Sequence, residues 1–504
     1  MTRATPEHLE VRIRGHADRR ARCYAHRMQR RIAWTVLAVL VPALAGADTL
    51  EVGPGQPFAK PCDAIAAAHA GDRIEVDAAG NYDGDTCEWS TDNLTVVGIH
   101  GRAKIDLTGV TPAGEKGIFT VDAPNATIQS FELSGAAISA ADGNNGAGIR
   151  HGGTNLTVID CYLHDDQDGI LGAPATAGTG SIVIEASEFA NNGAGDGFSH
   201  NMYLGDYGSV TLLGSYSHGA KLGHLVKSRG YVNLVLYNRI TDEAGTTASY
   251  EIDLPNGGTS YVIGNFIEQS AASQNPTIVS SGEEGATNPD QHFFFINNTV
   301  VNDLASGTFV SLAAGTTALL ENNIFHGAGT VTSLASATQT TNWTDAQGDP
   351  MLANPAAYDY HLQPGSPCID TGTLPGTGLG SQSLVPTDEY VQPLMLEGRI
   401  VAGAAIDIGA DEVGGAAPLG DAGIGGASGD GGAGTPSHDS GCGCESPAAP
   451  STAVLAVIAG FAVLRRSRRR AASRRSIAAR CSATRGPNRS ATSRATSAGS
   501  ATSG

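Results

Sequence analysis

The central part of the sequence has few positive charges. Between residues 48 and 464 it holds 11 Lys and Arg against 47 Asp and Glu, whereas residues 465–504 hold eleven Arg and no acid. A body this acidic excludes nucleic acid as a partner, because nucleic-acid-binding proteins present a basic surface to phosphate. It fits an exported protein, and it leaves Ca²⁺ open as a cofactor, since carboxylates are the ligands that this cation prefers.

Cysteine is scarce in the body of the chain, residues 48–413, where Cys62, Cys87, Cys161 and Cys368 are the only ones. So few cysteines exclude a small fold that disulfides hold together. We expect Cys62 to pair with Cys87, and Cys161 to be a buried thiol, because it lies in an apolar, strand-like run. The sequence also lacks a phosphate-binding glycine loop, a CxxC zinc pattern and a nucleophile elbow.

Long apolar runs are absent too, and the two short ones lie near the ends. MQRR at 28–31, the apolar run IAWTVLAVLVPALA and the small residues AGA predict a signal peptide over residues 28–47. That run is too short to span a bilayer comfortably. Residues 1–27 are polar and rich in Arg, so we interpret them as a gene-model extension that precedes the true start.

The C-terminal end has the pattern of a second sorting signal. A Gly/Ala-rich linker over 414–441 precedes a tail over 442–470, in which Cys442 and Cys444, an apolar run and RRSRRR follow one another. The tail resembles the MYXO-CTERM signal of exported myxobacterial proteins. This implies delivery to the outer cell surface of a Gram-negative bacterium, with membrane contact only through the tail. The alternative is a single-pass anchor. Residues 471–504 are expected to be a disordered basic tail.

The body repeats a short strand-like segment every 22 to 33 residues. Each segment alternates apolar and polar residues, and no amphipathic helix separates the segments. This period predicts a β-solenoid, because propeller blades need roughly 40–50 residues and sandwiches rarely repeat their sequence. Asparagines at the expected corners suit left-handed turns and stacked hydrogen-bonding ladders. They are Asn238, Asn265, Asn297, Asn298, Asn322 and Asn323.

The body also resembles a known family. PCDAIAAAHAGDRIEV, LTVVGI and the asparagine corners are similar to right-handed parallel β-helix proteins of the pectate-lyase-like superfamily. The resemblance implies an all-β, right-handed parallel β-helix (solenoid) over residues 48–345, with a short N-terminal cap helix and a monomeric body. Residues 346–413 resemble a closing module called the choice-of-anchor Q domain, in the stretches 349–372 and IDIGADE (406–412). This fold carries lyases, hydrolases, epimerases and adhesins, so it does not fix an activity.

The scarce cations gather in one stretch, which holds Lys221, Lys227, Arg229 and Arg239. We expect the apolar residues Met202, Val226 and Ile252 to occupy equivalent inward positions on successive turns. Residues at equivalent positions on the three turns then form columns along the β-helix. The columns are Tyr203, Lys227 and Asp253; His200, His224 and Tyr250; and Asn201, Leu225 and Glu251. In this register Lys227, Arg229, Glu251 and Asp253 all face outward. A slip of one residue would exchange the two faces.

Three functions fit these residues. The stretch HLVKS resembles the lysine turn of some alginate lyases and chondroitinase B, which implies β-elimination on an extracellular acidic polysaccharide. Lys227 would then be the base, Arg229 would clamp a uronate, and Arg229, Tyr250 or a histidine (His200 or His224) would be the acid. The next turn reads YEID and lacks the arginine of that pattern.

The second function is glycoside hydrolysis by Glu251 and Asp253, with Glu283 or Glu284 as a third carboxylate. In the third, the protein is a non-catalytic adhesin or matrix protein, and the cations only neutralise the acidic turn beside them.

A weaker candidate is a cation loop at HDDQDG (164–169), where Asp165, Asp166 and Asp168 could supply carboxylates to Ca²⁺. The loop lacks the spacing and the closing Glu of an EF-hand. An exposed turn without a metal is the alternative.

Overall fold

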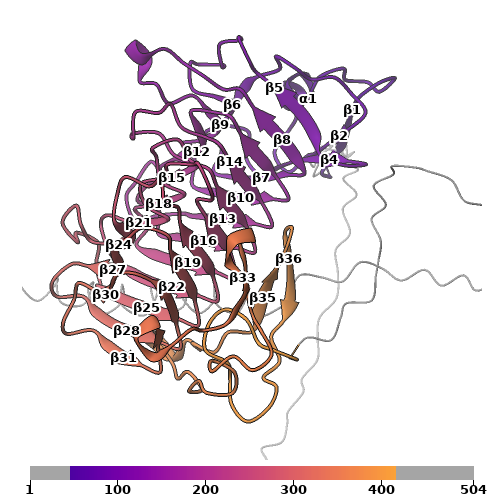
Figure 1. Ribbon diagram of the computed structural model, residues 1–504. Helices are drawn as coiled ribbons and strands as arrows, with labels where there is room; N and C mark the ends of the chain where they lie inside the picture. Colours follow the sequence, from indigo (N-terminus) through magenta and orange to yellow (C-terminus); the bar gives the residue numbers. More distant parts are fainter. Residues whose placement is uncertain (1–45, 416–504) are drawn as a thin grey trace, which may run out of the picture. The chain divides into compact units, whose positions relative to one another are not determined.

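The computed structural model describes residues 46–415, and these fold almost entirely as β-strands wound into a parallel β-helix (Figure 1). The prediction of an all-β, right-handed parallel β-helix is confirmed. The predictions for residues 1–27, for nearly all of the signal peptide and linker, and for residues 442–470 and 471–504 lie outside the described part. Within residues 46–415, no helix is both long and apolar enough to cross a membrane.

Three parallel sheets, called A, B and C, run along the β-helix, and each complete turn from β4 to β30 contributes one strand to each sheet. Sheet A contains β1 (Thr49–Val52), β2 (Arg73–Asp77), β4 (Leu94–Ile99), β7 (Asn125–Gln129), β10 (Asn155–Ile159), β13 (Ser181–Glu185), β16 (Ser209–Leu213), β19 (Val232–Leu236), β22 (Thr259–Ile263), β25 (His292–Ile296), β28 (Thr317–Glu321) and β31 (Thr338–Thr340). Sheet B contains β3 (Cys87–Trp89), β6 (Gly117–Val121), β9 (Ala147–His151), β12 (Asp168–Gly172), β15 (Met202–Leu204), β18 (Val226–Ser228), β21 (Ile252–Leu254), β24 (Thr277–Ser281), β27 (Thr308–Leu312) and β30 (Thr330–Thr332). Sheet C contains β5 (Ala103–Asp106), β8 (Phe131–Ser134), β11 (Tyr162–His164), β14 (Glu188–Ala190), β17 (Tyr216–His218), β20 (Arg239–Thr241), β23 (Phe266–Gln269), β26 (Thr299–Asn302), β29 (Ile324–Gly327) and β32 (Trp343–Thr344).

The predicted cap helix is present as α1 (Pro61–Ala67). One strand precedes it, because β1 pairs in parallel with β2 at the start of sheet A. Cys62, at the second position of α1, forms the predicted disulfide with Cys87 of β3. Cys161 is a buried free thiol, as predicted, and so is Cys368. Short 3-10 helices occupy Ala140–Asp142, Asp345–Gln347, Pro355–Ala357 and Leu379–Ser381.

The corners between sheets A and C hold the turns together. Residues directly after the sheet A strands adopt left-handed backbone, among them Asn297 at φ 51° and Asn322 at φ 56°. In four successive turns the next position carries a fully buried asparagine. The side-chain amide nitrogen of each asparagine donates a hydrogen bond to the side-chain oxygen of the asparagine in the following turn. The donor–acceptor pairs are Asn238–Asn265 at 2.9 Å, Asn265–Asn298 at 2.9 Å, Asn298–Asn323 at 3.1 Å and Asn323–Asn342 at 2.9 Å. The predicted turns and ladder are therefore confirmed, and the ladder fixes the register of one turn on the next.

The C-terminal module packs against the outer surfaces of sheets A and C. It contains two antiparallel hairpins, β33 (Leu352–Asn354) with β34 (Asp359–Leu362) and β35 (Asp388–Val391) with β36 (Met395–Gly398). Leu384 and Leu396 belong to an apolar cluster with side chains of β16, β19, β22 and β25. Tyr360 and Tyr390 belong to a second cluster, with residues of β17, β23, β26 and β29. This cover explains why β22 is buried along its whole length, whereas β10 alternates buried and half-buried positions.

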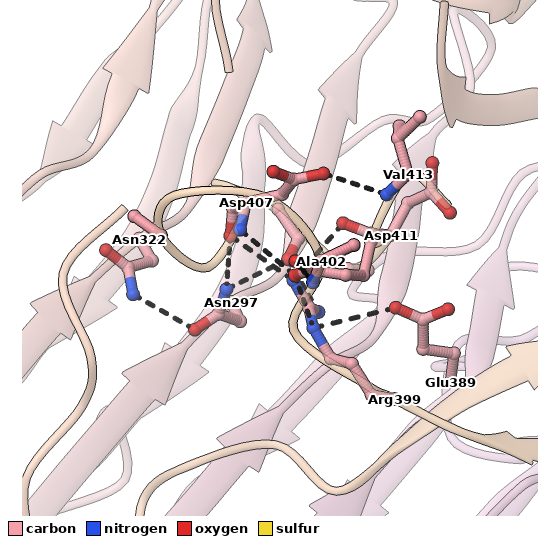
Figure 2. A network of polar contacts seen from close by, with 12 residues as sticks. Asn297, Asn322, Glu389, Arg399, Ala402, Asp407, Asp411 and Val413 are labelled. Atoms are coloured by element: carbon pink, nitrogen blue, oxygen red, sulfur yellow. Dashed lines mark hydrogen bonds and ion pairs between the residues drawn. The ribbon is translucent and has the colours of Figure 1, made fainter. Parts of the chain in front are cut away.

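A buried ionic network attaches the module to the β-helix (Figure 2). Arg399 is fully buried, lies 3.0 Å from the carboxylate of Glu412, and donates hydrogen bonds to the carbonyl oxygens of Asp407 and Gly409. The same two carbonyls accept hydrogen bonds of 2.9 and 3.1 Å from the side chain of Asn297. One short segment, IDIGADE, therefore binds both the arginine of the module and a corner of the β-helix.

Candidate functional site

Three neighbouring strands of sheet B carry the candidate site. Lys227 of β18 pairs with Tyr203 of β15 on one side and with Asp253 of β21 on the other. The residues that precede them, Met202, Val226 and Ile252, are buried in the core. Because successive side chains of a strand point to opposite faces, the middle residue of each strand faces outward. The predicted register is therefore confirmed for this column.

Two cations and two carboxylates form a compact cluster on this surface. The Lys227 ammonium lies 3.3 Å from Asp253 Oδ2 and 3.4 Å from Glu284 Oε1. Arg229 pairs with Glu284 Oε2 at 2.6 Å, and its Nε donates to the Tyr203 hydroxyl at 2.9 Å. Burial alone would raise the pKa of Glu284, but the hydrogen bond from Arg229 and the charge of Lys227 hold that pKa below its ordinary value. Glu284 therefore binds both cations as a carboxylate.

The ring of Tyr203 lies beside both cations. Lys227 Nζ is 5.4 Å and Arg229 Cζ is 5.6 Å from the ring centroid. A cation near an aromatic ring is attracted by the negative potential above its faces. Arg229 also donates a hydrogen bond to the side chain of Asn256, in the loop after β21. The guanidinium is thus held by three partners on three different turns.

Two neighbouring histidines lie just before the same strands. The rings of His200 and His224 are 4.4 Å apart, and His200 Nδ1 accepts a hydrogen bond of 3.0 Å from the His224 backbone. His224 Nδ1 lies 3.2 Å from Asp253 Oδ2, so this carboxylate contacts both His224 and Lys227. Burial lowers the pKa of His224, and burial together with nearby positive charge lowers the pKa of His200 well below its ordinary value. Both imidazoles are therefore neutral at pH 7.

The prediction that Glu251 faces outward is wrong. Its side chain is buried inside the β-helix, and its carboxyl oxygens have no hydrogen-bond partner among residues 46–415. At this corner two successive residues point inward, as the equivalent Leu225 and Val226 of the preceding turn do. Glu251 and Asp253 thus lie on opposite sides of sheet B, so the pair proposed for glycoside hydrolysis cannot act on one substrate.

Glu251 belongs to a group of buried acids. Burial raises its pKa well above the ordinary value, and the charges of Asp242 and Glu268 add to this shift. Burial likewise raises the pKa of Asp242 to about 6 and that of Glu268 to about 8. Glu268 is therefore mostly protonated in the folded protein at neutral pH, and burial favours the neutral acid of Glu251 in the same way, because the interior solvates an anion poorly.

The predicted cation loop is also wrong in its geometry. Asp165 points to the surface, where it pairs with His164 and Lys221, whereas Asp166 and Asp168 are buried. Asp166 accepts a hydrogen bond from the backbone of Ala136, and Asp168 accepts one from that of His200. The three carboxylates diverge, and the described part of the chain contains no group of three or more His, Cys, Asp or Glu arranged to hold a metal ion. We therefore derive no step that uses Ca²⁺.

The four clustered cations of the sequence do not share one site. Lys221 pairs with Asp165 at 3.5 Å, outside the cluster. Arg239 is in sheet C, where it stacks on Tyr216 and donates to the Tyr358 carbonyl of the module. The main residue that sequence reasoning left unplaced is Glu284. Its only signal was the acidic SSGEEG stretch, because the loop after β24 brings it back over two turns of the β-helix.

Comparison with known proteins adds one finding. No family model matches this sequence, and no curated protein matches it. The resemblances of the module and the tail therefore stay predictions. Among solved structures, the chain is similar to the crystal structure of pectate lyase Pel9A, with a TM-score of 0.51 and 14% sequence identity over 73% of this chain and 97% of that chain. At this identity the likeness shows the fold alone: the chain is a parallel β-helix like that of pectate lyase Pel9A.

Proposed function

We propose that this protein binds an acidic extracellular polysaccharide on the outer face of sheet B, through Lys227 and Arg229. The observation that carries the proposal is the carboxylate of Glu284, which bridges the two cations with one oxygen on each. A uronate carboxylate has the same charge and shape as this group. The two cations are thus already positioned to bind the acidic group of a sugar.

The charge of the remaining chain supports an acidic glycan as the ligand. Most of the body is acidic and would repel a polyanion, so binding requires a local concentration of cations. Lys227 and Arg229 provide it, and the module covers sheets A and C rather than this face. The predicted signal peptide and tail support the further proposal that the protein acts at the outer cell surface.

Cleavage by β-elimination is the second candidate function, and the contact of Asp253 with both His224 and Lys227 favours it. In this reaction a base removes the C5 proton of a uronate, the C4–O bond breaks to leave a C4–C5 double bond, and the leaving oxygen takes up a proton. Once the substrate carboxylate replaces Glu284, the Lys227 ammonium would pass a proton to the neutral imidazole of His224 through Asp253, which contacts both groups. The resulting Lys227 amine would take the C5 proton, and the His224 imidazolium would give its proton to the leaving oxygen. The unsaturated product absorbs in the ultraviolet, so cleavage and binding can be measured in the same samples.

The proposal predicts that Lys227→Met and Arg229→Met each weaken binding of an acidic polysaccharide by about tenfold to a hundredfold. Each variant removes a charge-assisted contact, which contributes about 1.5–3 kcal/mol, and keeps part of the apolar stem. Calorimetric titration against alginate, pectate, chondroitin and a heparin-like polymer measures the effect. Binding by the unchanged protein should also weaken as salt is added.

Lys104→Met is the matched control for this experiment. Lys104 forms a comparable pair of 2.8 Å with Glu132, but it belongs to β5 of sheet C. The control should bind like the unchanged protein. Equal affinity of the control and the Lys227 and Arg229 variants would contradict the proposed site, and failure of the unchanged protein to bind any of the four polymers would contradict the function.

Glu284→Gln is expected to raise the affinity for the same polymer by about twofold to tenfold. The glutamine keeps the size of the side chain but no longer competes as an anion for the two cations. The neighbouring Glu283→Gln is the control, because Glu283 accepts a hydrogen bond from Ser311 instead. A loss of affinity in Glu284→Gln would show that Glu284 orients the cations and does not occupy the ligand position.

A further inference from the structure

We propose that Phe198 is a second contact for the glycan, an aromatic surface on which a sugar ring further along the same glycan chain stacks. This inference rests on the proposed binding at Lys227 and Arg229 and extends it. Phe198 lies in the loop of residues 191–201, which connects β14 of sheet C to β15 of sheet B. The loop therefore ends where the candidate site begins.

The exposure of Phe198 sets it apart from every other Phe, Tyr and Trp side chain in residues 46–415. It is 83% exposed, while all the other Phe, Tyr and Trp side chains of this part are buried or half-buried. Exposed large apolar side chains are otherwise few in this part, and most of them belong to the C-terminal module. Covering such a ring with a ligand is favourable, because it removes a large apolar surface from water.

The loop holds the backbone that carries this ring in place. Asp196 accepts a hydrogen bond of 2.9 Å from the backbone of Phe198, and its other oxygen accepts one of 2.8 Å from the side chain of Asn144 in an adjacent loop. Ser199, the next residue, is buried and accepts a hydrogen bond of 2.7 Å from the backbone of Ala194. The backbone on both sides of Phe198 is thus fixed, so the ring can bind a ligand with little loss of backbone entropy.

A short stretch of backbone and the side chains of His200 and Tyr203 connect Phe198 to the cation cluster. His200, two residues further along, contacts the ring of Tyr203 at 5.4 Å and that of His224 at 4.4 Å. Tyr203 in turn binds Arg229. Two residues of extended chain span about 7 Å at most. Phe198 and the cations are therefore near enough for one oligosaccharide to reach both.

The chemistry of the two contacts identifies the occupant. A pyranose ring presents C–H groups on its faces, and these pack on an aromatic ring, while a carboxylate several sugars away in the same chain binds the cations. An acidic oligosaccharide has both features. A protein partner or a second copy of this chain could cover an exposed phenylalanine, but neither accounts for the nearby carboxylate-binding pair.

The test compares Phe198→Ala with the unchanged protein for a disaccharide and a hexasaccharide of the polymer that binds. Phe198→Ala should weaken hexasaccharide binding about fivefold to tenfold and leave disaccharide binding unchanged, whereas Lys227→Met should weaken both. Leu374→Ala, which removes another exposed apolar side chain (67% exposed) from the C-terminal module, is the control and should change neither. Phe198→Trp provides a second readout, because stacking should shift the fluorescence of the introduced tryptophan when the hexasaccharide is added, unlike that of Leu374→Trp.

The outcomes separate this inference from the proposed function. Equal hexasaccharide affinity of Phe198→Ala and the unchanged protein, with Lys227→Met still impaired, would overturn the role of Phe198 alone. If the unchanged protein binds no acidic polymer, both proposals fall. A change in oligomeric state of Phe198→Ala in sedimentation, with unchanged binding, would instead assign the ring to contact between copies of the chain.

Discussion

Arg399→Ala is expected to lower the free energy of unfolding by about 3–5 kcal/mol, because it leaves Glu412 as a buried charge without its partner. Glu412 is 3% exposed, and its pair with Arg399 is the ionic core of the network that attaches the module (Figure 2). Burial raises the pKa of the second nearby acid, Glu389, to about 8, although Arg399 opposes this shift. At neutral pH Glu389 is therefore mostly protonated, and the lost ion pair is the one with Glu412.

Urea denaturation followed by tryptophan fluorescence measures this effect, since Trp343 packs against the module and donates to the Gly348 carbonyl. Arg102→Ala is the control. Arg102 pairs with Asp160 at 2.8 Å, but both side chains are partly exposed, so its loss should cost less than about 1 kcal/mol. Adding Glu412→Gln to Arg399→Met should recover part of the stability. If Arg399→Ala costs no more than the control, the network does not hold the module in place.

Glu251→Leu is expected to raise the free energy of unfolding at pH 8 by about 2–4 kcal/mol, because it replaces a buried carboxyl without partners by an apolar side chain. The equivalent position of the preceding turn is Leu225, and the next turn has Ile278, both in the core. An apolar residue therefore fits this column, and the natural glutamate is the exception.

The stability that Glu251→Leu gains over the unchanged protein should increase as the pH rises. The folded pKa of Glu251 is raised, so the native protein binds a proton that the unfolded chain loses near pH 4.5. The stability linked to this proton is fully present below the unfolded pKa and is lost as the pH rises towards the folded pKa. Glu251→Leu lacks this loss, so its advantage should grow from pH 4 to pH 8. Glu251→Gln should show the same trend with a smaller gain. A destabilised Glu251→Leu would mean that the carboxyl has a binding partner in solution.

The fold could be predicted because the sequence repeats its physical pattern in every turn. Strands such as β10 alternate inward and outward residues, and the asparagines recur where each corner needs a side chain that both donates and accepts. The outward column of Tyr203, Lys227 and Asp253 followed from aligning three apolar residues. At all these positions the alternation of apolar and polar residues along the strand predicts the same orientation of the side chain as the alignment of successive turns.

Not every residue of the site could be predicted. The sequence repeat predicts which residues lie side by side on the strands, but it does not predict the contacts that the loops make. Glu284 comes from a loop whose course over the cations is set by its own turns. Glu251 was misplaced because strand alternation was extended one residue into a corner, where the backbone turns and a second residue faces inward. The outer cover of sheets A and C likewise follows from long-range packing of the module.

The asparagine ladder also determines how this molecule can change its length. Each asparagine donates to the following turn and to the strand of the preceding one, as Asn265 does to Asn298 and to the carbonyl of Val235. Duplicating or deleting a complete turn keeps every such link, whereas inserting a single residue breaks one. The β-helix can therefore be lengthened by complete turns. Each added turn places one more strand beside the site in sheet B, with its outward residues aligned with those of the site, and so extends the surface available to a long polymer.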